Sequence, residues 1–394
     1  MSLLNQRYQS YLKATENKDA PFLLLDLDLL DQNIESLIHA SGDKKIRVAT
    51  KSLRSLSVLN YIAEKLGTRY AGPMCFTLGE AVELWEKGQR NILVGYPTIN
   101  RHEIQNFIDS AVLSDITLMV DHESHLELLE EFGSKNNKIF SVCLDVDMSS
   151  RFPAFTFGVH RSALRTVKDV KKFLPKLSHC RHLKLKGCMG YEAQIAGVTD
   201  AGIKNEIVRM LKRKSLKEIV WRRGSVLEFL KSSGEKLAFV NGGGTGSLKE
   251  TIKEEGITEV TIGSGFYSPA LFDHYVDFQY DPALSFALPV VRNPSKNVFT
   301  ALGGGYIASG AIDKLKAPVP YLPEGMELFP LEGAGEVQTP FRYRGKENVM
   351  LSKVFFRHAK AGEICERFST ILCVRESKIV NEFKTYRGEG YCFL

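Results

Sequence analysis

The sequence lacks the segments that direct a chain into or across a membrane. Its first 20 residues are polar and contain no apolar core like that of a signal peptide. Its longest apolar runs are far shorter than the roughly 20 residues that span a bilayer. We therefore expect a cytoplasmic protein with no membrane partner.

Closely spaced cysteines are also missing. The chain has seven cysteines, an odd number, and no two of them are three residues apart. Disulfide frameworks and zinc sites need paired or closely spaced cysteines, and most of these lie inside apolar runs. The pattern predicts buried free thiols in a reducing compartment.

Basic and aromatic residues are not combined as nucleic-acid binding requires. The net charge of +6 is spread along the chain, and the densest basic stretch, residues 204–223, is typical of the solvated face of a helix. A basic stripe with interleaved aromatic residues is absent from the sequence, so we expect no nucleic-acid partner.

The chain does contain a long alternation of strand-like and helix-like segments. Its 394 residues fit a barrel of about 250 residues plus a second domain of about 100. Eight apolar runs alternate with amphipathic segments, at residues 46–50, 69–72, 91–95, 116–120, 139–146, 183–189, 237–240 and 259–262. Because strands that alternate with helices form a parallel sheet, eight such units predict a (β/α)8 TIM barrel of the α/β class.

The pattern changes after about residue 281, where prolines interrupt short extended runs and helical periodicity disappears. These runs, at residues 290–291, 298–300, 349–356 and 368–374, predict a C-terminal antiparallel β domain. We therefore predict a lead segment over residues 1–20, the barrel over residues 21–280 and the β domain over residues 281–394. The apolar run at residues 22–27 precedes the eight strands and could pair with the second domain instead.

Lys51 stands at the end of the first predicted barrel strand. The carboxyl ends of the strands form the mouth of such a barrel, where catalytic residues lie. Partial burial there would lower the pKa of the amine, and a neutral amine can form a Schiff base with an aldehyde. Lysine also ends many strands that have no function, so Lys51 alone does not decide between these readings.

Two glycine-rich segments follow the last two strands. The segment from Gly242 to Gly246 leads straight into a predicted helix, where converging backbone N–H groups and the helix start would attract a phosphate. Its spacing differs from the dinucleotide-binding fingerprint, and a plain tight turn is the alternative. The expected phosphate contacts are Gly243, Gly244, Thr245, Gly263, Ser264 and Gly265.

Barrel closure would bring this phosphate site next to Lys51. A phosphate site beside an aldehyde-reactive amine indicates pyridoxal 5′-phosphate (PLP). At these residues the chain resembles the PLP enzymes built on a barrel, the alanine racemase-like group of fold type III, and within it the D-threonine aldolase and D-serine dehydratase branch. The matching segments are Pro21 to Asp28, Arg47 to Ser52, Cys75 to Ala81, Gly190 to Glu192 and Gly242 to Gly246.

The resemblance implies that Lys51 holds PLP as a Schiff base and that the substrate is a small amino acid. The branch favours a lyase, of aldolase or dehydratase type, that acts on a β-hydroxy D-amino acid. A racemase is the alternative and would need a second base, for which Tyr306, Tyr343 and Tyr386 are candidates. A non-catalytic PLP-binding protein, or a flavin or sugar-phosphate barrel, would belong to a different class. The resemblance also implies a homodimer in which the β domain of one chain closes the barrel mouth of the other.

Four further positions are candidates for the site. Arg151 could approach the phenolic oxygen of the cofactor or the substrate carboxylate, and Arg161 competes for that role. Tyr191 could reach the cofactor or simply pack at the barrel top. His358 matches the first metal-binding position of the branch, but Lys360 replaces the aspartate or cysteine that follows, and lysine is a poor ligand for a divalent cation. We therefore predict no metal ligands, and His358 as an acid or base or as a structural histidine.

Overall fold

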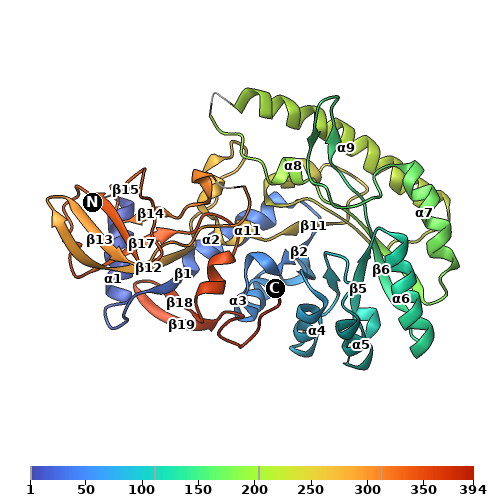
Figure 1. The fold of residues 1–394 in the computed structure, drawn as a ribbon, viewed down its shortest axis with the longest axis horizontal. Helices are drawn as coiled ribbons and strands as arrows, with labels where there is room; N and C mark the ends of the chain where they lie inside the picture. Colours follow the sequence, from blue (N-terminus) through green and yellow to red (C-terminus); the bar gives the residue numbers. More distant parts are fainter. Residues whose placement is uncertain (1, 111, 203–204, 312) are drawn as a thin grey trace.

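The computed structural model describes residues 2–110, 112–202, 205–311 and 313–394. A closed barrel forms one part of the molecule and a large antiparallel sheet forms the other (Figure 1). The barrel strands, in the order in which they pair, are β10 (Phe239–Gly242), β11 (Glu259–Ile262), β2 (Lys45–Ala49), β3 (Tyr70–Cys75), β4 (Ile92–Val94), β5 (Ile116–Val120), β6 (Phe140–Asp145) and β9 (Leu183–Gly190). All neighbours in this order run parallel, so the eight predicted barrel strands are confirmed.

Amphipathic helices cover the barrel. They are α2 (Leu27–Ala40), α3 (Leu56–Leu66), α4 (Leu78–Glu86), α5 (Arg101–Ser110), α6 (Glu123–Asn136), α7 (Val167–His179) and α9 (Glu206–Ser232), with the short α8 (Ala193–Ala196), α10 (Leu248–Thr251) and α11 (Ser264–Tyr267). Capping residues set where they begin. Helix α7 starts at Val167 because Thr166 and Asp169 form a capping box.

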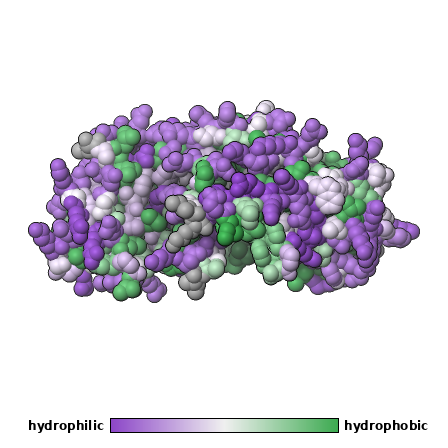
Figure 2. All heavy atoms as spheres, turned by 90° about the horizontal axis from the view of Figure 1, so that it is seen from above, coloured by the Kyte–Doolittle hydropathy of each residue, from purple (hydrophilic) through white to green (hydrophobic). Residues whose placement is uncertain are grey.

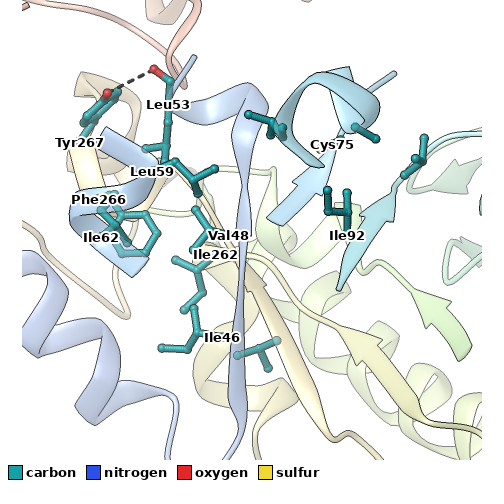
Figure 3. Close-up of a cluster of buried hydrophobic side chains, with 14 of the residues drawn as sticks. Ile46, Val48, Leu53, Leu59, Ile62, Cys75, Ile92, Ile262, Phe266 and Tyr267 are labelled. Atoms are coloured by element: carbon teal, nitrogen blue, oxygen red, sulfur yellow. Dashed lines mark hydrogen bonds between the residues drawn. The ribbon is translucent and has the colours of Figure 1, made fainter. Parts of the chain in front are cut away.

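A continuous apolar layer joins these helices to the strands. Ile46 and Val48 of β2 lie beside Ile262 of β11 and near Ile62 of α3 (Figure 3). Each fully buried aliphatic side chain of this kind contributes about 1.5–3 kcal/mol relative to an exposed one. This layer holds β2 and β11, the strands that precede Lys51 and the second glycine-rich segment, in a defined position.

Side chains also fill the inside of the barrel. Met119, Cys143 and Phe239 belong to one cluster of buried apolar residues, and Arg47 and Glu259 form a buried ion pair in which Arg47 Nε is 2.5 Å from Glu259 Oε1. Asn241 Nδ2 donates to the same carboxylate at 2.9 Å. The interior is therefore closed, and space for a ligand lies at the strand ends.

The second sheet has nine strands. They are β1 (Phe22–Asp26), β12 (Leu284–Ser295), β13 (Val298–Leu302), β14 (Val319–Leu322), β15 (Met326–Leu328), β16 (Gln338–Tyr343), β17 (Lys353–Arg357), β18 (Thr370–Arg375) and β19 (Lys378–Lys384). The predicted antiparallel β domain is confirmed, with one exception: β18 runs parallel to β1.

Strand β1 pairs with this sheet, between β12 and β18, and takes no part in the barrel. The first helix, α1 (Leu3–Ala14), packs on the same sheet through Tyr8 and Tyr11. The apolar run at residues 22–27 therefore pairs with the second domain, which is one of the two arrangements expected from the sequence. The boundaries at residues 20 and 280 stay a prediction.

The surface is largely polar. Seen from above, hydrophobic residues gather near the middle of the face, between regions dominated by hydrophilic ones (Figure 2). Within the described residues, every helix is too short or too polar to span a bilayer.

Candidate functional site

A cavity of about 610 Å³ lies at the carboxyl ends of the barrel strands. The ends of the barrel strands line it, for example Met74, Asp121 and Asp145, and Lys360 and Ala361 of the second part of the chain complete the wall. This is the face on which (β/α)8 barrels carry their active sites. Residues that line this cavity can contact the same ligand, so its lining shows which of the predicted site residues could act together.

Lys51 lies on the cavity wall, in a 3₁₀ turn (Thr50–Ser52) directly after β2. The hydroxyl of Thr50 donates to Met74 O at 2.9 Å and holds this turn against β3. The Lys51 side chain is exposed, so the partial burial expected from the sequence is wrong for the single chain. The reason is that the cavity opens to solvent at this point.

Tyr96, which follows β4, is the hydrogen-bond partner of Lys51: Nζ lies 2.8 Å from the tyrosine hydroxyl. Burial alone would raise the pKa of Tyr96, but the charge and hydrogen bond of Lys51, together with Arg161, outweigh it and lower that pKa. A tyrosine of this kind can share or accept the proton of the lysine.

The two glycine-rich segments lie side by side in the cavity wall. Gly243, Gly244, Thr245, Gly246, Gly263 and Ser264 all line it. A β-carbon on Gly246 would be 2.5 Å from Ala196 O, and one on Gly263 would be 2.6 Å from Ser52 Oγ. Glycine is needed at both positions because the backbone approaches its neighbours so closely.

Some backbone N–H groups of this wall donate to protein acceptors, and others have no acceptor among the described residues. Gly243 N donates to Glu192 Oε2 at 2.7 Å, Gly244 N to Ser247 Oγ at 3.0 Å, and Gly265 N to Thr245 Oγ1 at 3.2 Å. Gly265 does not line the cavity. For the N–H groups of Thr245, Gly246 and Ser264, no acceptor is found among the described residues.

This arrangement fits a phosphate group. Three residues of the cavity lining carry N–H groups for which the described part of the chain offers no acceptor, one of them Ser264 with its hydroxyl, and a phosphate oxygen accepts such donors. The helix that follows the first segment is short, since only a 3₁₀ turn (Thr245–Ser247) and α10 succeed it. Converging N–H groups, and not a long helix, supply the positive potential.

Tyr191 follows β9 and lines the cavity beside Gly244. Burial raises the pKa of its hydroxyl, although the Lys51 and Arg161 charges oppose the shift. Its neighbour Glu192 is buried and contacts Arg223 of α9 as well as the N–H of Gly243. Glu192 thereby ties the first glycine-rich segment to a helix.

The two arginine candidates end up in different places. Arg161 lines the cavity, with its guanidinium 6.0 Å from the centre of the Tyr191 ring. Arg151 is exposed on a small hairpin formed by β7 (Ser150–Arg151) and β8 (Thr156–Phe157), away from the cavity lining.

His358 lies outside the cavity lining, behind its wall. It is buried against Tyr267, with ring centroids 6.3 Å apart, and burial together with the Arg357 charge lowers its pKa to about 3. Lys360 does line the cavity; its Nζ donates to Ser309 O at 3.2 Å and lies 3.9 Å from Glu363. Over the ranges that the structure describes, no group of three or more His, Cys, Asp or Glu side chains could hold a metal.

Sequence reasoning missed one side of the cavity. Asp121, His125, Asp145 and Asp147, from the ends of β5 and β6, all line it. Burial and the neighbouring charge of Asp121 raise the pKa of Asp145 to about 7, while Arg161 acts in the opposite direction. Tyr96 was missed as well. Each of these residues lies within a few positions of the end of a predicted strand, which is the signal that could have found them.

Comparisons with known proteins agree with this fold. The model of the alanine racemase N-terminal domain family matches residues 25–267. No curated protein matches the sequence. Among solved structures, the chain is similar to D-threonine aldolase from Filomicrobium marinum, with 16% identity, a TM-score of 0.80, and 94% of this chain and 95% of that chain covered.

Two further structures share the fold. D-threo-3-hydroxyaspartate dehydratase from Delftia sp. HT23 is 17% identical, with a TM-score of 0.72 over 93% of this chain and 97% of that chain. Alanine racemase from Bacillus anthracis is 18% identical, with a TM-score of 0.61 over 94% and 98% of the two chains. At these identities the likeness concerns the fold.

Proposed function

The chain belongs to the family of the alanine racemase N-terminal domain, a PLP-dependent family, and from this premise we propose that it is a PLP-dependent lyase, of aldolase or dehydratase type, that acts on a β-hydroxy D-amino acid. The observation that carries the proposal is the meeting, in one cavity of about 610 Å³, of the Lys51 amine and unpaired N–H groups at Thr245, Gly246 and Ser264. PLP, when bound, supplies an electron sink for a bond broken at the α-carbon of an amino acid.

The residues of this chain divide the remaining work. Lys51 is the amine that holds the cofactor aldehyde, and the N–H groups of Thr245, Gly246 and Ser264 bind its phosphate. Tyr191 packs against the cofactor at the barrel top. Arg161 supplies a cation for the substrate carboxylate or the cofactor phenolic oxygen, because it lines the cavity and Arg151 does not.

The lyase is favoured over a racemase by two points. The sequence resembles the aldolase and dehydratase branch, and the D-threonine aldolase structure superposes with a TM-score of 0.80 against 0.61 for the alanine racemase. A racemase also needs a proton donor on each face of the α-carbon. Of the tyrosines considered for that role, Tyr306, Tyr343 and Tyr386, none lines the cavity in the described chain, whereas Tyr96 does. Racemisation is therefore the second candidate, with Tyr96 of this chain, or one of those three tyrosines from a second copy, as the further proton donor.

We also propose a homodimer that closes the cavity. Lys51 is exposed in the single chain, and an open mouth would leave it in contact with water. Ile99 and Phe155, on loops that follow β4 and β6, are 76% and 48% exposed and could be covered by a second copy. The cytoplasmic location stays a prediction.

One experiment tests the proposed function. Purified protein is loaded with PLP, reduced with borohydride and digested, and the modified peptide is identified by mass spectrometry. A separate sample of PLP-loaded enzyme, not treated with borohydride, is incubated with a panel of D-amino acids. The products are resolved as aldehyde plus glycine, keto acid plus ammonia, or the L-enantiomer. Modification at Lys51 with either of the first two outcomes supports the lyase. The L-enantiomer alone would establish the racemase, and an unmodified Lys51 would contradict both.

A further inference from the structure

His125 lies where an acid–base residue of this cavity is needed. The chain has nine histidines, all within the described residues, and His125 is the one that lines the cavity shared with Lys51. It stands in the first turn of α6, four residues after Asp121 at the end of β5. The short connection between strand and helix therefore brings both side chains to the barrel mouth.

The imidazole is oriented by a carboxylate. Its Nδ1 lies 3.2 Å from Asp121 Oδ1, and both side chains are mostly buried, with 18% and 10% of their surface exposed. In the structure the backbone N–H of Asp121 donates to Nδ1 at 3.4 Å. This hydrogen bond and a proton on Nδ1 exclude each other. Because the carboxylate contact is the shorter one, we assign the proton to Nδ1 in the reacting enzyme, where Nδ1 donates to Asp121 and Nε2 accepts a proton. When Nε2 takes up a proton, Asp121 stabilises the resulting charge.

The other basic groups of the site are less suited to this task. His358 is outside the cavity lining, and its pKa of about 3 makes it a weak base. Lys360 is held by Ser309 and Glu363. Tyr96 is already the partner of Lys51.

We propose that His125, oriented by Asp121, is the acid–base residue that exchanges a proton with the β-hydroxyl of the substrate. This inference rests on the proposed function. In the cleavage direction, Nε2 accepts the hydroxyl proton as the Cα–Cβ bond breaks and the β-carbon becomes an aldehyde. The electron pair of that bond passes to the α-carbon, which then takes a proton to give glycine.

The same residue makes the site selective for the hydroxyl group. A substrate without a β-hydroxyl gives Nε2 nothing to deprotonate, although its α-proton can still exchange with solvent. The two reactions therefore depend on His125 to different degrees, which makes the proposal testable within a single enzyme.

The test uses the PLP-loaded enzyme and two readouts. The first is the formation of aldehyde from D-threonine and D-phenylserine. The second is the exchange of the α-proton of D-alanine in D₂O, followed by NMR. We expect His125→Ala to reduce aldehyde formation by about 10²–10⁴-fold, the usual contribution of a general base, and to change α-proton exchange by less than about 10-fold. Added imidazole should restore part of the lost cleavage.

Four further variants complete the experiment: His125→Asn, Asp121→Asn, Asp145→Asn and a histidine control. His125→Asn keeps a polar side chain and should show the same split if the alanine variant does not fold. Asp121→Asn should reduce cleavage to a smaller extent, because it removes the carboxylate that orients the ring and stabilises its charge but leaves the imidazole in place. His102→Asn is the control, since His102 is exposed on α5 and does not line the cavity; it should behave like the parent.

Equal cleavage by the parent and His125→Asn would overturn the inference while leaving the lyase intact. A parallel loss of cleavage and exchange would also overturn it, because His125 would then act at the α-carbon or on folding. A selective loss of cleavage in Asp145→Asn, with His125→Asn unaffected, would assign the role to Asp145 instead. If the parent neither cleaves nor exchanges, the proposed function itself fails and the inference falls with it.

Discussion

The Nζ of Lys51 and the hydroxyl of Tyr96 lie 2.8 Å apart across the mouth of the barrel, although strand β3 separates the strands that precede them. A lysine on an open wall would otherwise sample many positions, because its side chain has four rotatable bonds. The tyrosine therefore holds the amine at one place beside the phosphate-binding wall.

Replacing Lys51 by alanine should abolish the covalent attachment of PLP and leave the fold intact, because the exposed side chain contributes little to packing. We expect no visible absorption band sensitive to borohydride and a loss of activity by several orders of magnitude. Absorption spectra and thermal unfolding measure the two effects. A spectrum identical to that of the parent would contradict the assignment of Lys51 as the residue that binds PLP covalently.

Gly263→Ala should weaken PLP binding. The new β-carbon would be 2.6 Å from Ser52 Oγ and 2.9 Å from Ala49 Cβ, so the segment that carries Lys51 must shift. Overpacking of this kind costs about 1–3 kcal/mol of stability. PLP occupancy of the purified protein is the measurement. Gly224→Ala is the matched control, since no atom lies within 4 Å of its β-carbon in α9; equal losses in both variants would argue against a specific effect at Gly263.

Arg161→Ala and Arg151→Ala should differ clearly. Arg161 lines the cavity beside Tyr191, whereas Arg151 is exposed on the β7–β8 hairpin. Loss of a cation that pairs with a carboxylate or phenolate costs about 1.5–3 kcal/mol, or about 10- to 100-fold in kcat/KM. We expect this loss for Arg161→Ala only. A larger loss in Arg151→Ala would mean that the hairpin folds over the site in the active enzyme.

Divalent metal should be dispensable, and Lys360 should not be. Lys360 lines the cavity, and the resemblance implies a metal ligand at this position of the sequence; an ammonium group there repels a dication. Chelator-treated enzyme should keep its activity, while Lys360→Ala should lose at least about 10-fold, as expected for a removed charge contact. Activity that disappears with chelator and returns with zinc or manganese would show this prediction to be wrong.

The free energy of unfolding should decrease as the pH rises, over the range in which the carboxyl group of Glu80 is protonated only in the folded state. This buried carboxyl accepts hydrogen bonds from Phe76 N at 2.7 Å and from the hydroxyl of Tyr386 at 2.8 Å, and burial raises its pKa from 4.5 to about 7. Between these values the folded state keeps a proton that the unfolded state has released. The free energy of unfolding therefore decreases from about pH 4.5 to 7 and levels off above it, by up to roughly 3 kcal/mol.

Urea unfolding at pH 5 and pH 8 measures this effect. Asp145, whose pKa is also raised to about 7, acts in the same direction, so the quantity of interest is the difference between the parent and Glu80→Gln. The variant should show a smaller loss between the two pH values. An equal loss in both proteins would exclude Glu80 as the cause.

The architecture of the barrel could be predicted because its signals are local. Each strand is a short apolar run and each helix has an apolar face, and these patterns depend only on which neighbours along the chain must be buried together. The glycine-rich segments after β10 and β11, and Lys51 after β2, could be placed for the same reason. Their proximity followed from closing eight strands in chain order.

What the tertiary structure decided were contacts between residues far apart in the chain. The path of the β7–β8 hairpin places Arg161 in the cavity lining and Arg151 outside it. Glu192 accepts the N–H of Gly243, whereas the described residues offer no acceptor for the N–H of Gly246. The meeting of Tyr96 with Lys51, and of Asp121, His125 and Asp145 in one wall, likewise depends on how the strand ends converge. Sequence alone determined the strands, the helices and the segments rich in glycine, because burial along one element is periodic. Convergence of side chains on a common cavity has no such period, since it depends on loop paths and on the three-dimensional packing that closes the barrel.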